Sequence, residues 1–388
     1  MRRASFLLAL ATLAGCTANA GAPPPAAPQA SSPSPAVTGA PEVELRADAV
    51  RVIATGLRIP WGLAFLPDGT ALVTERGNEV PTGIRPTTPG SREVIDTSGV
   101  PRILSVTPAG KVTEVQRLSE VDTRIGEGGL LGIAVSPNYA TDRWVYIYYS
   151  AATDNRIARL HLGEPPQPIL TGIPVADLEG ARYHQGGRLA FGPDGMLYAS
   201  VGETFVTRDI AQDRTNLGGK ILRMTPEGRP APGNPFPDSP VWSYGHRNVQ
   251  GLAWDPAGRM YASEFGAGLF DELNVIQPGA NYGWPAVEGA SSDTRFVNPL
   301  VSWTPTRIAS PSGIAVLGDH VYLACLAGRR MYRVSLDGRT VEALVGDYGR
   351  LRTVAVAPDG SLWVMTSNRD GRGTPTGDDD RILRITPP

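Results

Sequence analysis

The chain has 388 residues, of which 41% are hydrophobic and 19% charged, and its formal net charge is −2 at pH 7. A chain of this length and composition can bury a large core. A charge so close to zero gives no electrostatic reason to expect nucleic acid or an anionic membrane surface as a partner. The 45 glycines and 36 prolines favour an all-β fold rich in turns.

Residues 1–16 have the features of an export signal. Arg2 and Arg3 provide a basic start, and the apolar run at 6–13 is too short to span a membrane. The sequence Leu-Ala-Gly-Cys at 13–16 resembles a bacterial lipobox, which implies lipidation of Cys16. A plain cleaved signal peptide with an incidental cysteine is the alternative. We expect an exported protein of the cell envelope or periplasm that contacts the membrane only through this lipid.

Residues 17–42 are predicted to be an extended tether, because their Ala/Pro/Ser-rich composition cannot build a core. The folded domain is then expected to span 43–388. Cys325 is its only cysteine, so no disulfide forms within it. Since Cys325 lies in an apolar run at 321–326, we expect a buried strand residue without chemistry.

A self-similar unit recurs six times in this domain. Each copy has a short apolar strand, in most copies a turn of the Pro-Asp-Gly type, and a second alternating strand. The copies start at Leu63, Ile133, Leu189, Leu252, Ile314 and Val354, so the offsets are 70, 56, 63, 62 and 40 residues. Such periods with several short strands predict a six-bladed β-propeller.

A propeller must close its ring, and two terminal segments are available to do so. Residues 50–53 and 382–385 are expected to complete one blade together, which would protect edges that otherwise attract other chains. The long segment at 78–101 is predicted to be a surface loop over one face. Because blades converge on an axis, polar loops from distant parts of the chain can meet at one central mouth.

Five polar segments are candidates for this mouth. They lie at 126–132, 183–189, 243–251, 263–285 and 349–352. The first is glycine-rich but is no P-loop, since no Lys-Ser/Thr follows. The second contains His184, which could be a general base or a structural, hydrogen-bonded residue. The third offers arginine and asparagine donors for carboxylates or carbonyl oxygens, or turn-stabilising side chains.

The last two segments carry charge. The fourth has carboxylates and loop carbonyls of the kind that calcium prefers, although it lacks EF-hand spacing. In the fifth, strand alternation places Arg350 and Arg352 on the same side. Two guanidinium groups there repel each other unless an anion or a carboxylate lies between them.

Several strings together resemble one known family, the soluble pyrroloquinoline quinone (PQQ)-dependent glucose/sorbosone dehydrogenases, which include bacterial aldose sugar dehydrogenases. The resemblance covers residues 50–387, and the family fold is a six-bladed propeller. The strings occur in the family's order at 60–65, 129–132, 184–189, 217–223, 244–251 and 281–285. The resemblance implies an oxidoreductase that oxidises the anomeric C1 hydroxyl of aldoses to lactones with hydride transfer to PQQ. The implied partners are a small sugar substrate and an electron acceptor of unknown identity.

The resemblance also implies roles for individual residues. His184 matches the family's catalytic base, and Arg247 matches a residue that stabilises negative charge on the reduced quinone. Glu127 and Asn248 match positions near PQQ. The pair Arg350 and Arg352, discussed above, matches residues that bind PQQ carboxylates.

Calcium positions are implied in the same way. The carbonyl oxygens of Gly266 and Ala267 match those that bind the Ca²⁺ that also chelates PQQ. Glu272, Tyr282 and Asp293 fall where some members bind a second, structural calcium.

The chain departs from the family's glucose enzymes at three positions. Tyr183 stands where they have an aspartate, Phe265 where they have a glutamine, and Ala327 where a lysine contacts PQQ. Arg329 or Arg330 could substitute for that lysine. Phe265 and Ala327 favour an alternative, a non-catalytic envelope propeller that binds sugars or polymers and has lost the cofactor. A calcium-dependent propeller hydrolase such as a lactonase is a weaker reading.

Replacing the predicted lipidation site tests the anchor. We expect Cys16→Ser to release the protein from membranes into the soluble envelope fraction, because the polypeptide has no other predicted attachment. Fractionation followed by immunoblotting measures this. Unchanged membrane association of the variant would contradict the lipoprotein assignment.

Overall fold

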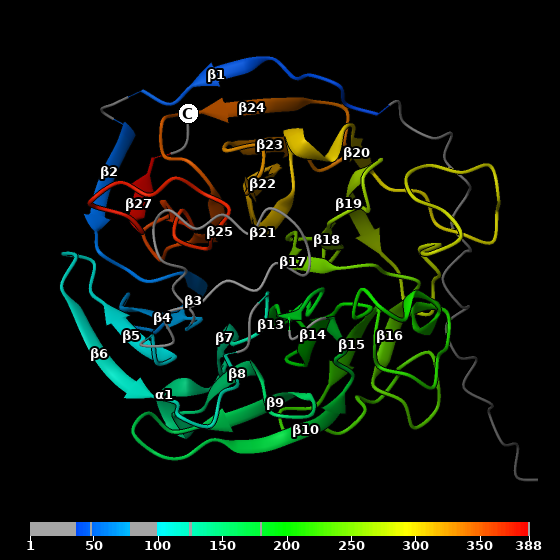
Figure 1. Cartoon of the computed structure of the whole chain (residues 1–388), viewed down its shortest axis with the longest axis horizontal. Coiled ribbons are helices and arrows are strands. Elements are labelled where there is room, and N and C mark those ends of the chain that lie inside the picture. The colour runs from blue at the N-terminus through cyan, green and yellow to red at the C-terminus, as the bar shows by residue number, and fades with distance from the viewer. Residues whose placement is uncertain (1–35, 47–48, 78–98, 124–125, 179–180, 387–388) are drawn as a thin grey trace, which may run out of the picture. The chain divides into compact units, whose positions relative to one another are not determined.

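Six sheets form a ring in the computed structural model, which describes residues 36–46, 49–77, 99–123, 126–178 and 181–386 (Figure 1). These residues belong to one compact unit, 32–388. The six predicted repeats begin on β3, β7, β13, β17, β21 and β25, each of which is the first strand of a sheet. The all-β, six-bladed β-propeller is therefore confirmed.

Each blade contains four consecutive antiparallel strands, except at the point of closure, and the fifth blade gains β1 (Glu42–Glu44) as an additional parallel edge strand. The first three blades are β3 (Pro60–Phe65), β4 (Ala71–Glu75), β5 (Arg102–Val106) and β6 (Val112–Arg117); β7 (Leu130–Val135), β8 (Val145–Ser150), β9 (Asn155–Leu160) and β10 (Gln167–Ile173); and β13 (Leu189–Phe191), β14 (Leu197–Val201), β15 (Lys220–Met224) and β16 (Val241–Tyr244). The next two are β17 (Val249–Trp254), β18 (Met260–Glu264), β19 (Asp271–Ile276) and β20 (Val301–Trp303); and β21 (Pro311–Leu317), β22 (His320–Cys325), β23 (Met331–Ser335) and β24 (Val341–Val345).

The last blade joins the two ends of the domain. It contains β25 (Leu351–Val356), β26 (Leu362–Thr366), β27 (Ile382–Ile385) and the N-terminal β2 (Val50–Ala54). Val50 pairs with Ile385 and Val52 with Leu383, as predicted from the sequence. Smaller elements are the ribbon β11 (Asp177–Leu178) and β12 (Ala181–Arg182), helix α1 (Tyr139–Asp142) and two 3₁₀ turns, Arg208–Ala211 and Thr306–Ile308.

The first strands of neighbouring blades contact one another around the whole ring, β25 with β3 included. Strands between packed blades are buried on both faces, which explains why β8 and β26 have no exposed residue. Aromatic and β-branched side chains suit such strands because they pack well on a pleated surface. Cys325 on β22 is fully buried, as expected, and burial raises the pKa of its thiol.

The last residues of the predicted tether contact the propeller. Val37 exchanges backbone hydrogen bonds with Ser302 and Thr304 at 2.7 and 2.9 Å, and β1 (Glu42–Glu44) pairs in parallel with β24. Contacts with the propeller thus begin before residue 43. The rest of the predicted tether, the export signal with Cys16, and most of the predicted loop at 78–101 lie outside the described residues. In the described part of the chain, no helix is long and apolar enough to cross a membrane.

The seam between the last and first blades should be sensitive to mutation. Trp363 is 2% exposed and meets Phe65 edge-on, with ring centroids 5.1 Å apart. We expect Trp363→Ala to lower the free energy of unfolding by about 3–5 kcal/mol, because it leaves a cavity where the ring closes. Urea denaturation measures this. Val52→Ala, on the exposed face of β2, is the control and should change stability by less than about 0.5 kcal/mol. Equal effects of the two variants would contradict the importance of the seam.

Candidate active site

His184 lies on the loop between β12 and β13, in a backbone conformation that needs support. Its φ angle is +53°, which is unusual for a residue other than glycine. The chain around it is packed closely, since a Cβ on Gly202 would lie 2.0 Å from the carbonyl oxygen of His184. A Cβ on Gly186 would lie 2.6 Å from the Ser200 carbonyl oxygen. Glycine at these two positions therefore allows the backbone of neighbouring segments to pack directly against the His184 loop.

Two charged groups flank the His184 ring. Nδ1 lies 2.8 Å from Oε1 of Glu203, and Nε2 lies 3.1 Å from Nη2 of Arg247. An ionised carboxylate only accepts hydrogen bonds and a guanidinium group only donates them. The arrangement therefore favours a neutral imidazole with its proton on Nδ1 and a lone pair on Nε2. This is the form that a general base requires.

Glu203 was not identified from the sequence. It follows β14, is fully buried, and its second oxygen accepts a 2.7 Å hydrogen bond from the backbone N–H of Phe205. Phe205 meets the His184 ring edge-on at 4.9 Å. One carboxylate thus holds both the imidazole and the loop that packs against it.

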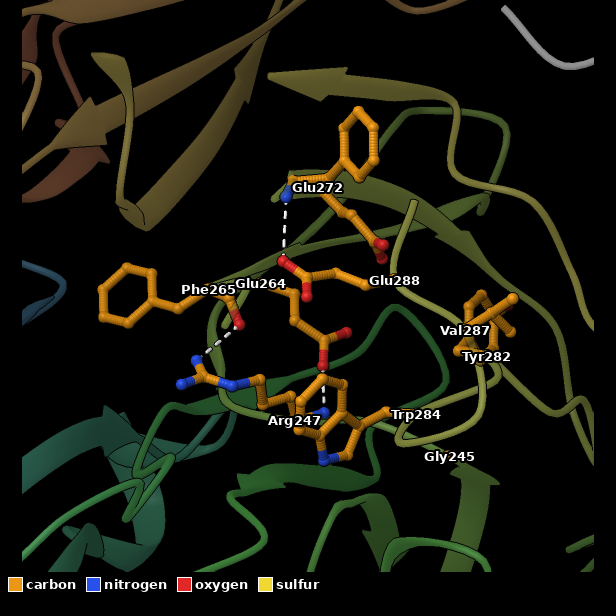
Figure 2. Close-up of a pocket in the computed structure, with 11 residues that line it drawn as sticks. Gly245, Arg247, Glu264, Phe265, Glu272, Tyr282, Trp284, Val287 and Glu288 are labelled. Atoms are coloured by element: carbon orange, nitrogen blue, oxygen red, sulfur yellow. Dashed lines mark hydrogen bonds between the residues drawn. The ribbon is translucent and has the colours of Figure 1, made fainter. Parts of the chain in front are cut away.

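Arg247 contacts His184, and Asn248 Oδ1 accepts the backbone N–H of Gly186 at 3.0 Å. Glu264 of β18 holds the backbone of Arg247 (Figure 2). Oε1 of Glu264 accepts the backbone N–H groups of Arg247 and Asn248, and its other oxygen lies 3.0 Å from Nδ1 of His246. Nη1 of Arg247 donates to the carbonyl oxygen of Phe265 at 3.0 Å. Nε of Arg247 and Nδ2 of Asn248 are buried and have no hydrogen-bond partner in the described part of the chain.

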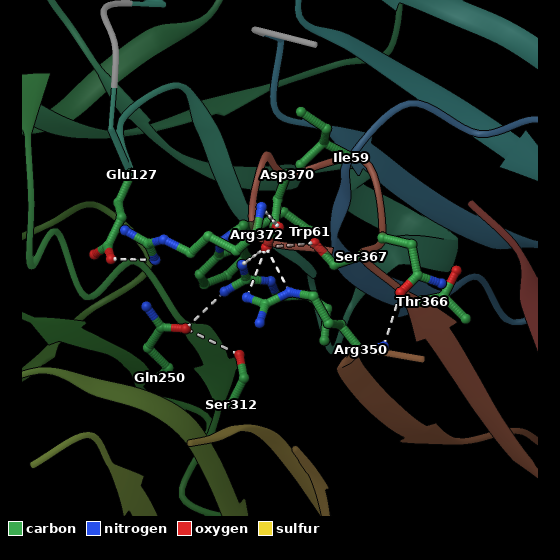
Figure 3. Close-up of polar contacts among 12 residues, drawn as sticks. Ile59, Trp61, Glu127, Gln250, Ser312, Arg350, Thr366, Ser367, Asp370 and Arg372 are labelled. Carbon is green, nitrogen blue, oxygen red and sulfur yellow. Dashed lines mark hydrogen bonds and ion pairs between the residues drawn. The ribbon is translucent and has the colours of Figure 1, made fainter. Parts of the chain in front are cut away.

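Glu127 contacts the backbone of His184. Its Oε2 accepts the His184 N–H at 3.0 Å, and its Oε1 accepts Nη1 of Arg372 at 3.1 Å (Figure 3). Burial opposes ionisation of Glu127, but Arg372 and His184 outweigh it and lower its pKa to about 2. Glu127 is therefore an anion throughout the neutral range.

Asp370 resolves the repulsion expected between Arg350 and Arg352. Its Oδ2 lies 2.9 Å from Nη2 of Arg350 and 3.5 Å from Nη2 of Arg352 (Figure 3). Nη1 of Arg352 also donates to Oε1 of Gln250 at 2.9 Å. Although Asp370 is buried, the two arginines hold its pKa well below the usual range. A side chain of the protein thus occupies the position between the pair.

The cluster nevertheless carries more positive than negative charge. Arg76 of the first blade interacts electrostatically with Asp370 and Arg350 and is 4% exposed. Among the described residues, the guanidinium groups of Arg76, Arg350, Arg352 and Arg372 interact with the carboxylates of Asp370 and Glu127. Arg188 adjoins Arg352, so the positive charges outnumber these two carboxylates. Burial lowers the pKa of Arg352 to about 9. The Nε atoms of Arg76 and Arg352 find no hydrogen-bond partner among the residues that the structure describes. Such a group suits an anionic ligand.

The predicted calcium loop leaves its carbonyl oxygens available. Gly266 and Ala267 use their backbone N–H groups, which donate to Asp271 and Glu288 at 2.9 Å each. Within the described ranges, neither carbonyl oxygen accepts a hydrogen bond. Gly266 lines one pocket together with Arg247, Glu272 and Tyr282 (Figure 2).

The residues of the predicted second calcium are only partly brought together. Glu272 lines this pocket, and burial together with Glu264 raises its pKa to about 8. The phenol of Tyr282 is committed to the backbone of Val275 and Gln277 at 2.7 and 2.9 Å. Asp293 pairs with the exposed Arg295 at 2.6 Å and is not part of the pocket lining. The described residues contain no group of three or more His, Cys, Asp or Glu side chains able to hold a metal ion, so the second site stays a prediction.

Arg330 is not free to replace the lysine missing at Ala327. Its Nη1 pairs with Glu42 on the outer strand β1 at 2.7 Å, and its Nε donates to Gly328 at 2.9 Å. The cations that the sequence analysis missed come from other blades, namely Arg76 and Arg372. A polar run at 367–372, directly after the last repeat, was the available signal for Asp370 and Arg372.

Comparisons with known proteins agree with one another. The family model described as "Glucose / Sorbosone dehydrogenase" matches residues 57–383. The PQQ-bound structure of aldose sugar dehydrogenase from Streptomyces coelicolor is 47% identical with a TM-score of 0.76, and the match covers 87% of this chain and 97% of that one. Aldose sugar dehydrogenase YliI of Escherichia coli strain K12 is 29% identical over 87% of this chain and 92% of its own. Quinoprotein glucose dehydrogenase B of Acinetobacter calcoaceticus is 29% identical over 63% of this chain and 54% of its own.

Replacing Glu203 with glutamine tests how the imidazole is held. Glutamine has one acceptor oxygen for two donors, Nδ1–H of His184 and the N–H of Phe205. We expect Glu203→Gln to lower the free energy of unfolding by about 1–3 kcal/mol, the cost of an unsatisfied buried donor. The ring ¹⁵N resonances of His184 should also shift. Urea denaturation and NMR of ¹⁵N-histidine-labelled protein measure the two effects.

The matched control is Asp319→Asn, since Asp319 pairs with the partly exposed His320 at 2.6 Å. It should leave both stability and the His184 resonances nearly unchanged. If Glu203→Gln behaves like this control, Glu203 does not hold the ring.

Proposed function

The chain belongs to the glucose/sorbosone dehydrogenase family, and from this premise we propose that it oxidises the anomeric C1 hydroxyl group of aldose sugars to lactones, with PQQ as hydride acceptor and Ca²⁺ bound beside it. The observation that carries the proposal is the His184 ring, whose Nδ1 lies 2.8 Å from Glu203 and whose Nε2 lies 3.1 Å from Nη2 of Arg247. A cluster of buried arginines adjoins it.

His184 supplies the base. Its Nε2 takes the proton of the C1 hydroxyl group as the C1–H bond gives up its electron pair and the C1–O bond becomes the lactone carbonyl. Bound PQQ supplies the acceptor for the hydride. Glu203 keeps Nδ1 protonated and stabilises the imidazolium that forms. Nη2 of Arg247 now donates to Nε2, and the sugar hydroxyl would replace that donor.

Arg247 has a second task. Phe265 anchors Nη1 through its backbone carbonyl oxygen, so the side chain at position 265 does not matter for this contact. Arg247 would stabilise the negative charge on a reduced quinone, the role that the family resemblance implies for it, and its burial would strengthen this effect. The unpartnered Nε of Arg247 and Nδ2 of Asn248 are donors that a polar cofactor would satisfy.

The arginine cluster fits a cofactor with carboxylate groups. Arg350 and Arg352 would hold such groups. The excess of positive charge, with the Nε atoms of Arg76 and Arg352 that lack a partner among the described residues, favours an anionic occupant. This excess speaks against the alternative of a propeller that has lost its cofactor, because unpaired buried charges destabilise a fold.

Calcium fits in part. The carbonyl oxygens of Gly266 and Ala267 are hard ligands of the kind that Ca²⁺ prefers, but two ligands alone do not bind it tightly. A bound cofactor with oxygen donors would complete the set. The proposed place of action, the cell envelope, rests on the predicted export signal and on Cys16.

Reconstitution tests the proposal. We expect the protein, given PQQ and Ca²⁺, to reduce an artificial dye with at least one member of an aldose panel. His184→Gln should lower kcat by about 10²–10⁴-fold, the usual contribution of a general base. PQQ affinity, followed by absorbance titration, should change little, and a calcium chelator should weaken it.

The control is His320→Gln on the rim of another blade, which should leave kcat unchanged. Absence of PQQ binding at saturating Ca²⁺ would refute the dehydrogenase assignment. Substantial turnover by His184→Gln would remove His184 from the role of base.

A further inference from the structure

We propose that Arg372 is a positioning residue for the catalytic base, acting through Glu127, which fixes the backbone of His184. This inference rests on the proposed function only insofar as His184 is the base. It gives Glu127 a task besides its expected place near the cofactor, and it gives Arg372 a task that the sequence did not suggest.

The backbone at His184 depends on contacts from outside its own loop. A φ of +53° is a conformation that persists only where the surroundings enforce it. The segment around Glu127 does so from two sides. Its backbone N–H donates to the carbonyl oxygen of Arg182 at 2.6 Å, and its Oε2 accepts the His184 N–H at 3.0 Å. The ring of His184 can point correctly only while this backbone holds.

Arg372 holds the other oxygen of Glu127. Nη1 of Arg372 lies 3.1 Å from Oε1, so the two carboxylate oxygens serve two different blades (Figure 3). The side chain of Glu127 is 15% exposed, whereas that of Arg372 is 46% exposed. Without Arg372, a nearly buried carboxylate would lose its ion pair and would turn toward water or toward another cation. Its hydrogen bond to His184 would then weaken.

The backbone of Arg372 is anchored to Asp370, the carboxylate that lies between Arg350 and Arg352. Its backbone N–H donates to Oδ1 of Asp370 at 3.0 Å, and the other oxygen of Asp370 holds Arg350. The connection therefore runs from the residues expected to bind the cofactor, through Asp370, Arg372 and Glu127, to the base. An error in the position of His184 would slow proton transfer more than it would weaken sugar binding.

A double-mutant cycle separates this role from independent cofactor contacts. We expect Arg372→Met and Glu127→Gln each to lower kcat about tenfold, with KM for the aldose changed less than about threefold. The double variant should be no worse than either single variant, because all three lack the same ion pair. Arg372→Lys, which keeps a cation, should restore most of the kcat. Losses that multiply in the double variant, or that appear in KM or PQQ affinity instead, would overturn the proposal.

Amide exchange gives a readout that needs no turnover. The chain has four histidines, so ¹⁵N-histidine labelling gives few, assignable backbone signals. In protein without cofactor, the His184 amide should exchange at least about tenfold faster in Arg372→Met than in the wild type. The His246 amide, which donates to Gly219, should be unaffected. Unchanged exchange of the His184 amide would refute the positioning role of Arg372 even if the protein oxidises sugars. Faster exchange of the His184 amide in a protein without dehydrogenase activity would support the positioning role of Arg372. It would refute only the proposed function.

Discussion

Closure of the ring is the constraint on which the rest of the structure depends. Strand β2 comes from the start of the domain and completes the blade that contains its last strand, β27. This pairing sets the last blade against the first, where Phe65 and Trp363 meet. Only in a closed ring does Arg372 from the last blade reach Glu127, which precedes the second. The site is thus a product of closure rather than of any one segment.

Carboxylates connect the elements that closure brings together. Glu203 joins the His184 ring to the Phe205 backbone, and Glu264 joins His246 to the Arg247 backbone. Glu127 and Asp370 use their two oxygens in the same way. A buried carboxylate satisfied on both oxygens is rigid, because loss of either partner leaves an unsatisfied charge in a medium of low dielectric. Such rigidity suits chemistry in which a proton and a hydride leave the same carbon–oxygen unit.

The balance of charge in the candidate active site favours an anionic ligand. The carboxylates that orient His184 and Arg247 are each matched by donors, whereas the guanidinium groups of the cluster outnumber the carboxylates that face them. The missing lysine at position 327 is therefore not a missing cation for the site as a whole. Arg76 and Arg372 supply positive charge from blades on either side of the seam.

The sequence by itself determined the fold and suggested half of the candidate site. Six turn-bearing repeats are a local signal, since each turn and strand is encoded within about ten residues, and they predicted the blades and the closing strands. Motifs identified His184, Arg247, Arg350 and Arg352 because these lie in ordered strings. Only the tertiary structure placed Asp370 between the two arginines, Glu203 against Nδ1 of His184, and Arg372 against Glu127. These contacts depend on packing between blades far apart in the chain. The family pattern grouped Asp293 with Glu272, whereas in the structure Asp293 pairs with Arg295. These two exposed residues are two positions apart in the sequence, so their ion pair forms locally and does not require the ring to close.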